Sequence, residues 1–367
     1  MNLLVWSSWV AHPAGGQEIT ALEMALEFKR RGHFVVLVGA YDNAPDLRAR
    51  IPDDLPYYFF DLHRRRIKPH LSALRLLQGV IERHGIQVVS AHGSIYAPYE
   101  ACRRRGIPLV WTVHGAQPRK AGFWEQLKFA GIRRAVRNQR THVVAVSRAT
   151  AEIIKKDLPC LESTRLHVIG VGRQNETALT ALPLPQRSSP WHLGFVGRLV
   201  ERKRPLDLVA IARRLEGKIE FDFHVFGDGP LLEPLRDCIR EQRLEHRFIL
   251  HGYWDKGSAG MIEQIHLLVH PDREEPFGAA LLEAQLGGRP VVAYNVGGNP
   301  EIVEHGITGW LVPVGDTDAL AAGVCSMVGE RFQVCSAAAR LRAMKKFSMA
   351  KMIDNYLALF QTACVSA

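Results

Sequence analysis

Short apolar runs alternate with amphipathic stretches along most of the chain, and this alternation predicts a doubly wound α/β fold. In the first half, the runs predict strands at 3–6, 34–38, 88–91, 109–113, 143–146 and 167–169. Between them, apolar positions at helical spacing predict helices, for example at 18–31 and 70–84. Ser147 follows one of these strands at the position where a helix N-cap is expected.

The pattern is interrupted at 176–190, a stretch rich in Pro, Ser, Thr and Leu that has no clear period. Such a stretch is typical of a linker. A second α/β series follows, with strands predicted at 193–196, 221–226, 248–251, 267–269 and 291–293. The predicted organisation is therefore an N-terminal domain at 1–175, a linker at 176–190, a C-terminal domain at 191–346 and a closing amphipathic helix at 347–367.

Length and composition agree with a two-domain globular protein, since 367 residues are enough for two hydrophobic cores. The six cysteines are scattered and include no Cys-x-x-Cys pair, which favours reduced thiols in a cytoplasmic protein over disulfides or zinc. The first residues predict a strand, because they lack the basic and apolar regions of a signal peptide. No apolar run approaches the roughly 20 residues that span a bilayer.

The net charge of +10 is concentrated in the first half of the chain. Residues 1–175 carry 26 Lys and Arg against 14 Asp and Glu, whereas the remainder carries 21 against 23. This imbalance predicts an anionic partner for the first half, and nucleic acid, anionic lipid or a phosphorylated glycan would each qualify.

The most basic stretch is Pro118–Arg140, in which aromatic residues alternate with the cations. This composition indicates a peripheral contact with an anionic membrane. The alternative is a helix that packs on its domain and exposes a solvated basic face. Nucleic acid is disfavoured, because the chain has no helix-turn-helix, zinc or RNA-recognition signature.

Two carboxylates, Glu275 and Glu283, flank the predicted start of a helix at Phe277 and Gly278. Free backbone N–H groups at a helix start attract phosphate, and carboxylates accept hydrogen bonds from sugar and ribose hydroxyls. The helix sequence is otherwise apolar, so a carboxylate beside its buried face needs a partner. This segment therefore favours an enzyme that binds a sugar nucleotide.

Two cations follow the strand at 193–196, and they are Arg198 and Lys203. At a strand end that faces a ligand crevice they would neutralise a diphosphate, although a solvated basic loop is the alternative. Gly16 lies in a Gly-Gly turn after the first strand, where the backbone could approach a phosphate. His92 and His114 each follow a strand, which indicates a role at the ligand-binding edge of the sheet.

Taken in order, these motifs resemble those of the family-4 retaining glycosyltransferases, which have the GT-B fold. The resemblance covers almost the whole chain, and it rests on Gly-Gly at 15–16 with Arg-Gly-His at 31–33, Thr-Val-His-Gly at 112–115, Ala-Val-Ser at 145–147, Val-Gly-Arg-Leu at 196–199 with Lys203, Phe-Gly-Asp-Gly-Pro at 226–230, the segment 275–283, and Gly-Gly-x-x-Glu at 297–301.

The resemblance implies two Rossmann-like domains that face each other across a cleft, with the acceptor in the N-terminal domain and the nucleotide-sugar donor in the C-terminal domain. It implies a last helix that returns to the N-terminal domain, no cofactor besides the donor substrate, and no divalent metal. It also implies a cytoplasmic protein that docks on the inner face of the plasma membrane through basic helices of the N-terminal domain. It also implies a role for each motif residue: Arg198 and Lys203 on the diphosphate, Gly278 at the phosphate-binding helix start, Glu283 on the ribose, Glu275 on the donor sugar, Gly16 near the donor phosphate, and His114 near the transferred sugar.

The chain departs from the family pattern at two places. Where the family often has Ile-Pro-Asn-Gly-Val-Asp, residues 169–174 read Ile-Gly-Val-Gly-Arg-Gln. Where the family continues Glu-Ala-Met-Ala, residues 283–286 read Glu-Ala-Gln-Leu. Two other functions stay open from the sequence: a sugar-nucleotide epimerase or phosphorylase on the same fold, and a non-catalytic basic module that binds membrane or nucleic acid.

Overall fold

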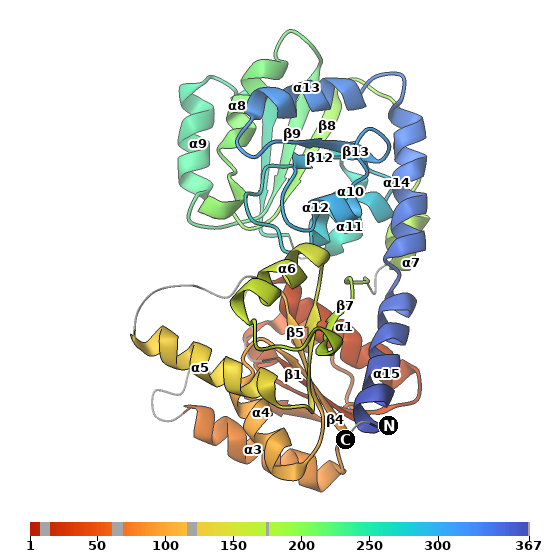
Figure 1. Cartoon of the computed structure of the whole chain (residues 1–367). Coiled ribbons are helices and arrows are strands. Elements are labelled where there is room, and N and C mark those ends of the chain that lie inside the picture. Colours follow the sequence, from red (N-terminus) through yellow and green to blue (C-terminus); the bar gives the residue numbers. More distant parts are fainter. Residues whose placement is uncertain (8–14, 61–68, 116–122, 174–175, 255, 366–367) are drawn as a thin grey trace. The chain divides into compact units, whose positions relative to one another are not determined.

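The computed structural model describes residues 1–7, 15–60, 69–115, 123–173, 176–254 and 256–365, without the side chains of 69–70 and 123–128. The chain divides into two compact units (Figure 1). The first unit comprises Met1–Gly172 and Met349–Ala367, and the second comprises Arg173–Ser348. Each is a Rossmann-like α/β unit built on a parallel sheet, so the predicted fold class is confirmed.

The sheet of the first unit has the strand order β3-β2-β1-β4-β5-β6-β7. Its strands are β1 (Asn2–Ser7), β2 (Phe34–Gly39), β3 (Tyr57–Phe59), β4 (Val88–His92), β5 (Leu109–Val113), β6 (Thr141–Ala145) and β7 (Leu166–Val168). Its α-helices are α1 (Gly16–Arg30), α2 (Pro45–Arg48), α3 (Pro69–His84), α4 (Tyr96–Arg105), α5 (Phe123–Arg137), α6 (Arg148–Asp157) and α15 (Met349–Val365).

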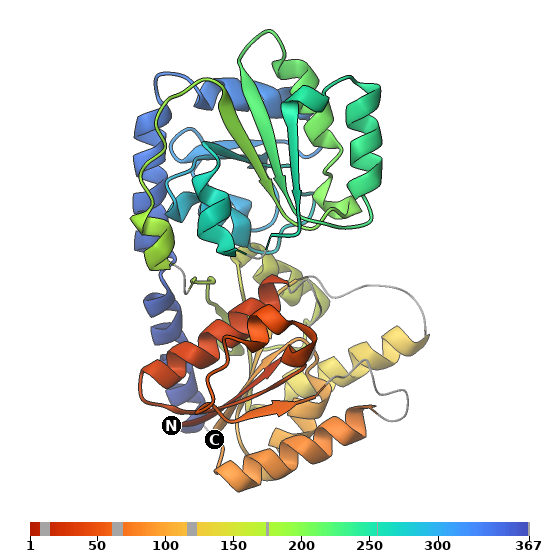
Figure 2. The same cartoon turned by 180° about the vertical axis from the view of Figure 1, so that it is seen from behind.

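Helices cover both faces of this sheet, because alternate strand residues point to opposite sides. Trp111 packs in a core that includes residues of α3, α4, α5 and α6. On the opposite face, Thr112 contacts α15, and its hydroxyl lies 2.9 Å from the Tyr356 hydroxyl. Helix α1 lies beside α15 on this face, as the reverse view shows (Figure 2). The expected N-cap of α6 is confirmed, since the Ser147 side chain accepts a hydrogen bond from the backbone N–H of Thr150.

The sheet of the second unit has the order β10-β9-β8-β11-β12-β13. Its strands are β8 (Trp191–Val196), β9 (Phe221–Phe226), β10 (Phe248–Gly252), β11 (Leu267–His270), β12 (Val291–Tyr294) and β13 (Gly309–Val312). Its α-helices are α7 (Glu176–Ala181), α8 (Asp207–Leu215), α9 (Leu232–Glu241), α10 (Gly257–Glu263), α11 (Ala279–Leu286), α12 (Asn299–Ile302), α13 (Thr317–Met327) and α14 (Phe332–Lys346).

The stretch without a sequence period, 176–190, is ordered against the second unit. It begins with the short helix α7, and its backbone carbonyls are held by side chains from elsewhere in that unit. The Arg289 guanidinium donates to the carbonyl of Pro183 at 2.9 Å, and the Arg340 guanidinium donates to the carbonyl of Leu182 at 2.7 Å. These contacts make the stretch part of the second unit.

Four histidines form a row across the sheet of the second unit. The His224 ring lies 3.2 Å from the His192 ring and 3.1 Å from the His251 ring, nitrogen to nitrogen. The backbone N–H of His192 donates to the His266 ring at 2.9 Å. Burial, reinforced by the neighbouring histidines, lowers the pKa of His224 to about 4, and burial likewise lowers that of His266 to about 4.

This row predicts that the second unit loses stability in mild acid. A histidine with a folded pKa near 4 and an unfolded pKa near 6.5 contributes fully above pH 6.5, and the contribution falls as pH drops toward 4. We expect the free energy of unfolding to fall by at least about 1 kcal/mol between pH 7.5 and 5, after allowance for solvent screening. Urea titrations at both pH values measure this, and His224→Gln should reduce the difference. An unchanged difference in that variant would contradict the assignment.

Candidate functional site

The predicted residues of the second unit gather where its strand order reverses. Arg198 and Lys203 follow β8, whereas Glu275 follows β11, and these two strands are neighbours at the centre of the sheet. In open parallel sheets, the carboxyl ends of the strands at such a switch point form the ligand-binding crevice. The fold therefore brings together residues that lie more than 70 positions apart in the sequence.

Lys203 is the centre of a buried charge cluster. Its ammonium lies 2.6 Å from Glu275 Oε2 and 2.5 Å from Asp272 Oδ2. Asp272 is completely buried, and it also pairs with Arg202 at 3.0 Å. Sequence reasoning did not identify Asp272, although its position two residues beyond a buried strand was a usable signal. The positive charge of Lys203 is thus balanced by two carboxylates of the protein itself.

Both oxygens of Glu275 have partners. Oε2 contacts Lys203 and lies 3.3 Å from His270 Nε2, while Oε1 accepts a 3.0 Å hydrogen bond from the backbone N–H of Gly278. Burial alone would raise the pKa of the Glu275 carboxyl, but the charge of Lys203 and the contact with His270 hold that pKa well below its usual value. Glu275 is therefore a fixed, ionised acceptor.

The start of α11 differs in two ways from the sequence interpretation. The helix begins at Ala279 with Gly278 as its N-cap, so Glu283 is the fifth residue of the helix and lies little more than one turn from its start. The N–H of Gly278, which was expected to face phosphate, donates to Glu275. Glu283 is paired as well, since its Oε1 lies 2.9 Å from Arg173 Nε.

Arg198 differs from the other charged residues of the site. Its side chain is exposed, and its guanidinium makes no hydrogen bond or ion pair within the described part of the chain. It follows Gly197, whose φ of +155° belongs to the close approach of the β8 and β9 loops. Arg198 is thus a cation that is available to an anionic ligand.

The Gly-Gly pair at 297–298 has a steric reason. A Cβ on Gly297 would lie 1.9 Å from the backbone oxygen of Glu275, and the φ of Gly297 is +53°. The N–H of Gly298 donates to the same oxygen at 2.8 Å. The two glycines therefore allow the 297–298 backbone to pack closely against the backbone of Glu275 and to bond its carbonyl oxygen.

We expect Gly297→Ala to destabilise the protein by about 2–4 kcal/mol and to lower activity, because Glu275 must move. Gly306→Ala is the matched control, since Gly306 has a φ of +77° but open space around its Cβ position. The control should cost only about 1 kcal/mol of backbone strain. Urea unfolding measures the free energy of unfolding of both variants. Equal losses of stability would show that the contact with Glu275 contributes nothing.

In the first unit, Gly16 and His114 also lie near a switch point, between β1 and β4. Gly16 is exposed in the first turn of α1. His114 follows β5, and its Nε2 lies 2.8 Å from Nδ1 of the fully buried His92. Burial, with a further contribution from His114, holds the pKa of His92 well below its usual value. His92 is thus a neutral ring that holds the half-buried His114.

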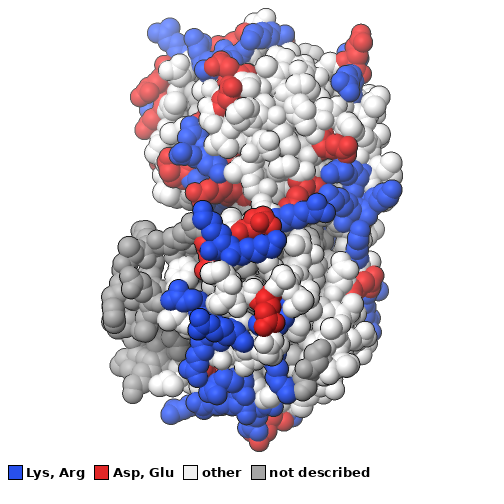
Figure 3. Space-filling model, viewed as in Figure 1, with Lys and Arg blue, Asp and Glu red and all other residues white. Residues whose placement is uncertain are grey.

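The basic stretch Pro118–Arg140 is described only in part, because residues 118–122 and the side chains of 123–128 lie outside the described residues. Figure 3 shows Lys and Arg gathered on one face of the first unit. In the same unit, α4 and α5 expose Arg103, Arg104, Arg105, Arg133, Arg134 and Arg137. Across the helices that are described, none is both long and apolar enough to cross a membrane.

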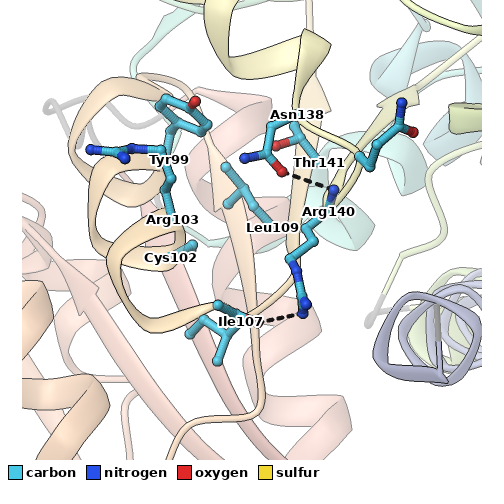
Figure 4. Close-up of a pocket in the computed structure, with 10 residues that line it drawn as sticks. Tyr99, Cys102, Arg103, Ile107, Leu109, Asn138, Arg140 and Thr141 are labelled. Atoms are coloured by element: carbon cyan, nitrogen blue, oxygen red, sulfur yellow. Dashed lines mark hydrogen bonds between the residues drawn. The ribbon is translucent and has the colours of Figure 1, made fainter. Parts of the chain in front are cut away.

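A small pocket of about 250 Å³ lies at the end of α4 (Figure 4). It is lined by Leu109 and Thr141, the first residues of β5 and β6. His114 follows the opposite end of β5, so this pocket is separate from the candidate site.

A metal does not fit the charge cluster as it stands. His270, Asp272 and Glu275 bring potential metal ligands within 4.8 Å of one another. The ammonium of Lys203 lies among them, however, and already neutralises both carboxylates. A cation would have to displace Lys203.

Comparisons with solved structures define the class of fold. A glycosyltransferase from Rickettsia africae has a TM-score of 0.80 at 19% identity, covering 99% of this chain and 98% of that one. Anabaena HepE in complex with UDP has a TM-score of 0.79 at 19% identity, covering 98% and 99%. The chain has the GT-B type of fold, with two Rossmann-like units.

Family models then assign the sequence. A model described as Glycosyltransferase Family 4 matches residues 14–173, and one described as Glycosyl transferases group 1 matches residues 190–330. The chain belongs to glycosyltransferase family 4.

Two curated relatives are 28% and 30% identical to this chain over the aligned parts. A 2-deoxystreptamine N-acetyl-D-glucosaminyltransferase of Niallia circulans is 30% identical over 46% of this chain and 44% of its own length. The alpha-maltose-1-phosphate synthase of Mycolicibacterium smegmatis is 28% identical over 70% of this chain and 73% of its own length. The match thus spans less than half of the first relative, and the two are named for different products.

Proposed function

We propose that this protein is a retaining glycosyltransferase that moves a sugar from a nucleotide diphosphate sugar to a glycan or lipid-linked acceptor in bacterial surface polysaccharide or lipopolysaccharide synthesis. The observation that carries the proposal is Arg198, an exposed cation without a partner in the described chain, which follows the same strand as Lys203 of the Lys203–Glu275 pair. Family membership and the complexes of HepE with UDP and UDP-glucose support a nucleotide-sugar donor.

In this proposal, the second unit binds the donor. Arg198 and Lys203 stabilise the charge that grows on the diphosphate as the glycosidic bond breaks, together with the start of α11 near Gly278. Glu283 accepts hydrogen bonds from the ribose hydroxyls. The acceptor hydroxyl attacks the face that the diphosphate leaves, and a departing phosphate oxygen takes its proton.

Glu275 positions the donor sugar and does not attack it. Both of its oxygens are already engaged, one by Lys203 and the other by the N–H of Gly278. An attack on the sugar carbon would compete with these contacts. Gly16 and His114 act from the first unit, Gly16 near the donor phosphate and His114 near the transferred sugar.

The proposal is tested by a thermal-shift screen against UDP-, GDP- and ADP-sugars in the presence of EDTA. A ligand that binds only the folded state raises the melting temperature. We expect one nucleotide class to stabilise the wild type without added metal, because Lys203 occupies the centre of the possible ligand cluster. Product analysis with and without acceptor then separates transfer from epimerisation or phosphorolysis. Stabilisation by none of the sugars would favour the non-catalytic basic module.

We also propose a peripheral contact between the basic face of the first unit and an anionic membrane. The exposed arginines of α4 and α5 support it, because each cation near an anionic surface adds about 1 kcal/mol of attraction. We expect co-sedimentation with phosphatidylglycerol vesicles that weakens at high salt and in an Arg133→Glu/Arg137→Glu variant. Phosphatidylcholine vesicles are the control. Equal binding to both lipids would contradict a charge-driven contact.

A further inference from the structure

Arg173 is the first residue of the second unit, at the point where the chain leaves the first unit. Its side chain is only 3% exposed, and its Nε lies 2.9 Å from Oε1 of Glu283. Burying a guanidinium is unfavourable unless a countercharge accompanies it, and Glu283 provides that countercharge. The pair therefore ties the start of the unit to α11.

The position of Arg173 is fixed by its surroundings. Its carbonyl accepts a 3.3 Å hydrogen bond from the N–H of Glu176, at the start of α7. Helix α7 packs against α11, the helix that carries Glu283. Arg173 thus lies three residues before a helix that packs on the helix of its partner, and this packing keeps the guanidinium beside the Glu283 carboxylate.

Glu283 nevertheless stays within reach of a ligand. Its side chain is 16% exposed, in contrast to the 3% of its partner. An ionised carboxylate has about four acceptor sites on two oxygens, so it can accept from a ligand while it is paired with Arg173. An arginine stands at this position, where the family pattern often has valine.

We propose that Arg173 is a positioning residue of the donor site, which orients the Glu283 carboxylate so that it recognises the ribose hydroxyls of a nucleoside diphosphate. The inference rests on the proposed function and deepens it. Arg173 does not contact the donor itself. It determines how strongly the site distinguishes a ribonucleotide from a deoxyribonucleotide, because a misplaced acceptor gains nothing from the hydroxyl.

The test uses whichever of UDP, GDP and ADP stabilises the wild type most, with its 2′-deoxy and 3′-deoxy forms. Calorimetry gives the dissociation constants for wild type, Arg173→Met, Arg173→Lys and Glu283→Gln. Wild type should bind the ribonucleotide about 10- to 100-fold more tightly than at least one deoxy form, since a hydroxyl bonded to a carboxylate is lost. The ratio of the deoxyribonucleotide dissociation constant to the ribonucleotide dissociation constant should fall to less than about threefold in Arg173→Met.

Arg289→Lys is the matched control, because Arg289 is also buried in the second unit but bonds only backbone carbonyls in the described contacts. It should keep the wild-type ratio. If Arg173→Met does not fold, Arg173→Lys carries the test, and a ratio between those of wild type and Glu283→Gln supports the inference. A folded Arg173 variant with the full wild-type ratio overturns it.

The two failures can be told apart. If wild type binds none of the three nucleoside diphosphates, the proposed function fails and this inference falls with it. If wild type binds one of them but shows no preference over its deoxy forms, only the inference is overturned. A merely structural role for Arg173 would lower the melting temperature without changing the ratio, and that outcome also overturns it.

Discussion

Replacing Lys203 with methionine should cost both stability and activity. The ammonium of Lys203 is the shared partner of Asp272, which is fully buried, and of Glu275. Its removal leaves two carboxylates close together without the ammonium that they share, and Asp272 keeps a second cation, Arg202. Breaking a buried pair in this way costs about 3–5 kcal/mol. We expect kcat/KM to fall at least about 100-fold as well, because the diphosphate loses a charged donor. Urea unfolding and initial-rate assays measure the two effects.

A double variant separates these effects. In Lys203→Met/Asp272→Asn, the fully buried negative charge is removed together with its partner, so part of the lost stability should return. Activity should not return, since the donor diphosphate still lacks Lys203. If the single variant is as stable as wild type, the cluster is not a buried ion pair in solution. If the double variant recovers activity, Lys203 has no direct role with the donor.

The apolar runs were sufficient to predict the central strands, because strands buried on both faces of a parallel sheet are almost continuously apolar. Strands β3 and β13 were not predicted. They have only three and four residues and lie at sheet edges, so their apolar runs are too short to stand out. Helix α7 was missed for a similar reason, since six residues are too few to show a helical period. The helix packs on α10 and α11, and Arg289 and Arg340 hold the backbone carbonyls that follow it.

The strand-end residues of the candidate site could be predicted from the sequence, whereas the ion pairs between its side chains could not. Arg198, Lys203 and Glu275 each follow an apolar strand, so their convergence follows from the order of strands in a doubly wound sheet. Side-chain packing decides the pairing. It places Asp272 against Lys203, and it places Arg173 against Glu283, more than 100 positions away. No local pattern carries such information. The charges that face inward were therefore the part of the site that required the structure.

Arg198→Ala should lower donor binding and activity without lowering stability, whereas Lys203→Met should lower both stability and activity. The guanidinium of Arg198 is exposed and makes no hydrogen bond or ion pair in the described chain, so its loss leaves no group unpaired. We expect the melting temperature of the ligand-free protein to stay unchanged. The stabilisation by a nucleotide sugar should largely disappear, and kcat/KM should fall about 100- to 1000-fold, because an electrostatic donor to the leaving diphosphate is removed.

Two further variants make this prediction specific to the site. Arg236→Ala removes another exposed arginine of the second unit, on α9, and should change neither ligand stabilisation nor rate. Arg198→Lys retains the charge but loses the two-pronged geometry of the guanidinium, so it should recover only part of the rate. Full activity in Arg198→Ala would remove Arg198 from the donor site and leave the Lys203 cluster as a structural ion pair. An equal loss in Arg236→Ala would instead mean that the effect follows the overall charge of the unit.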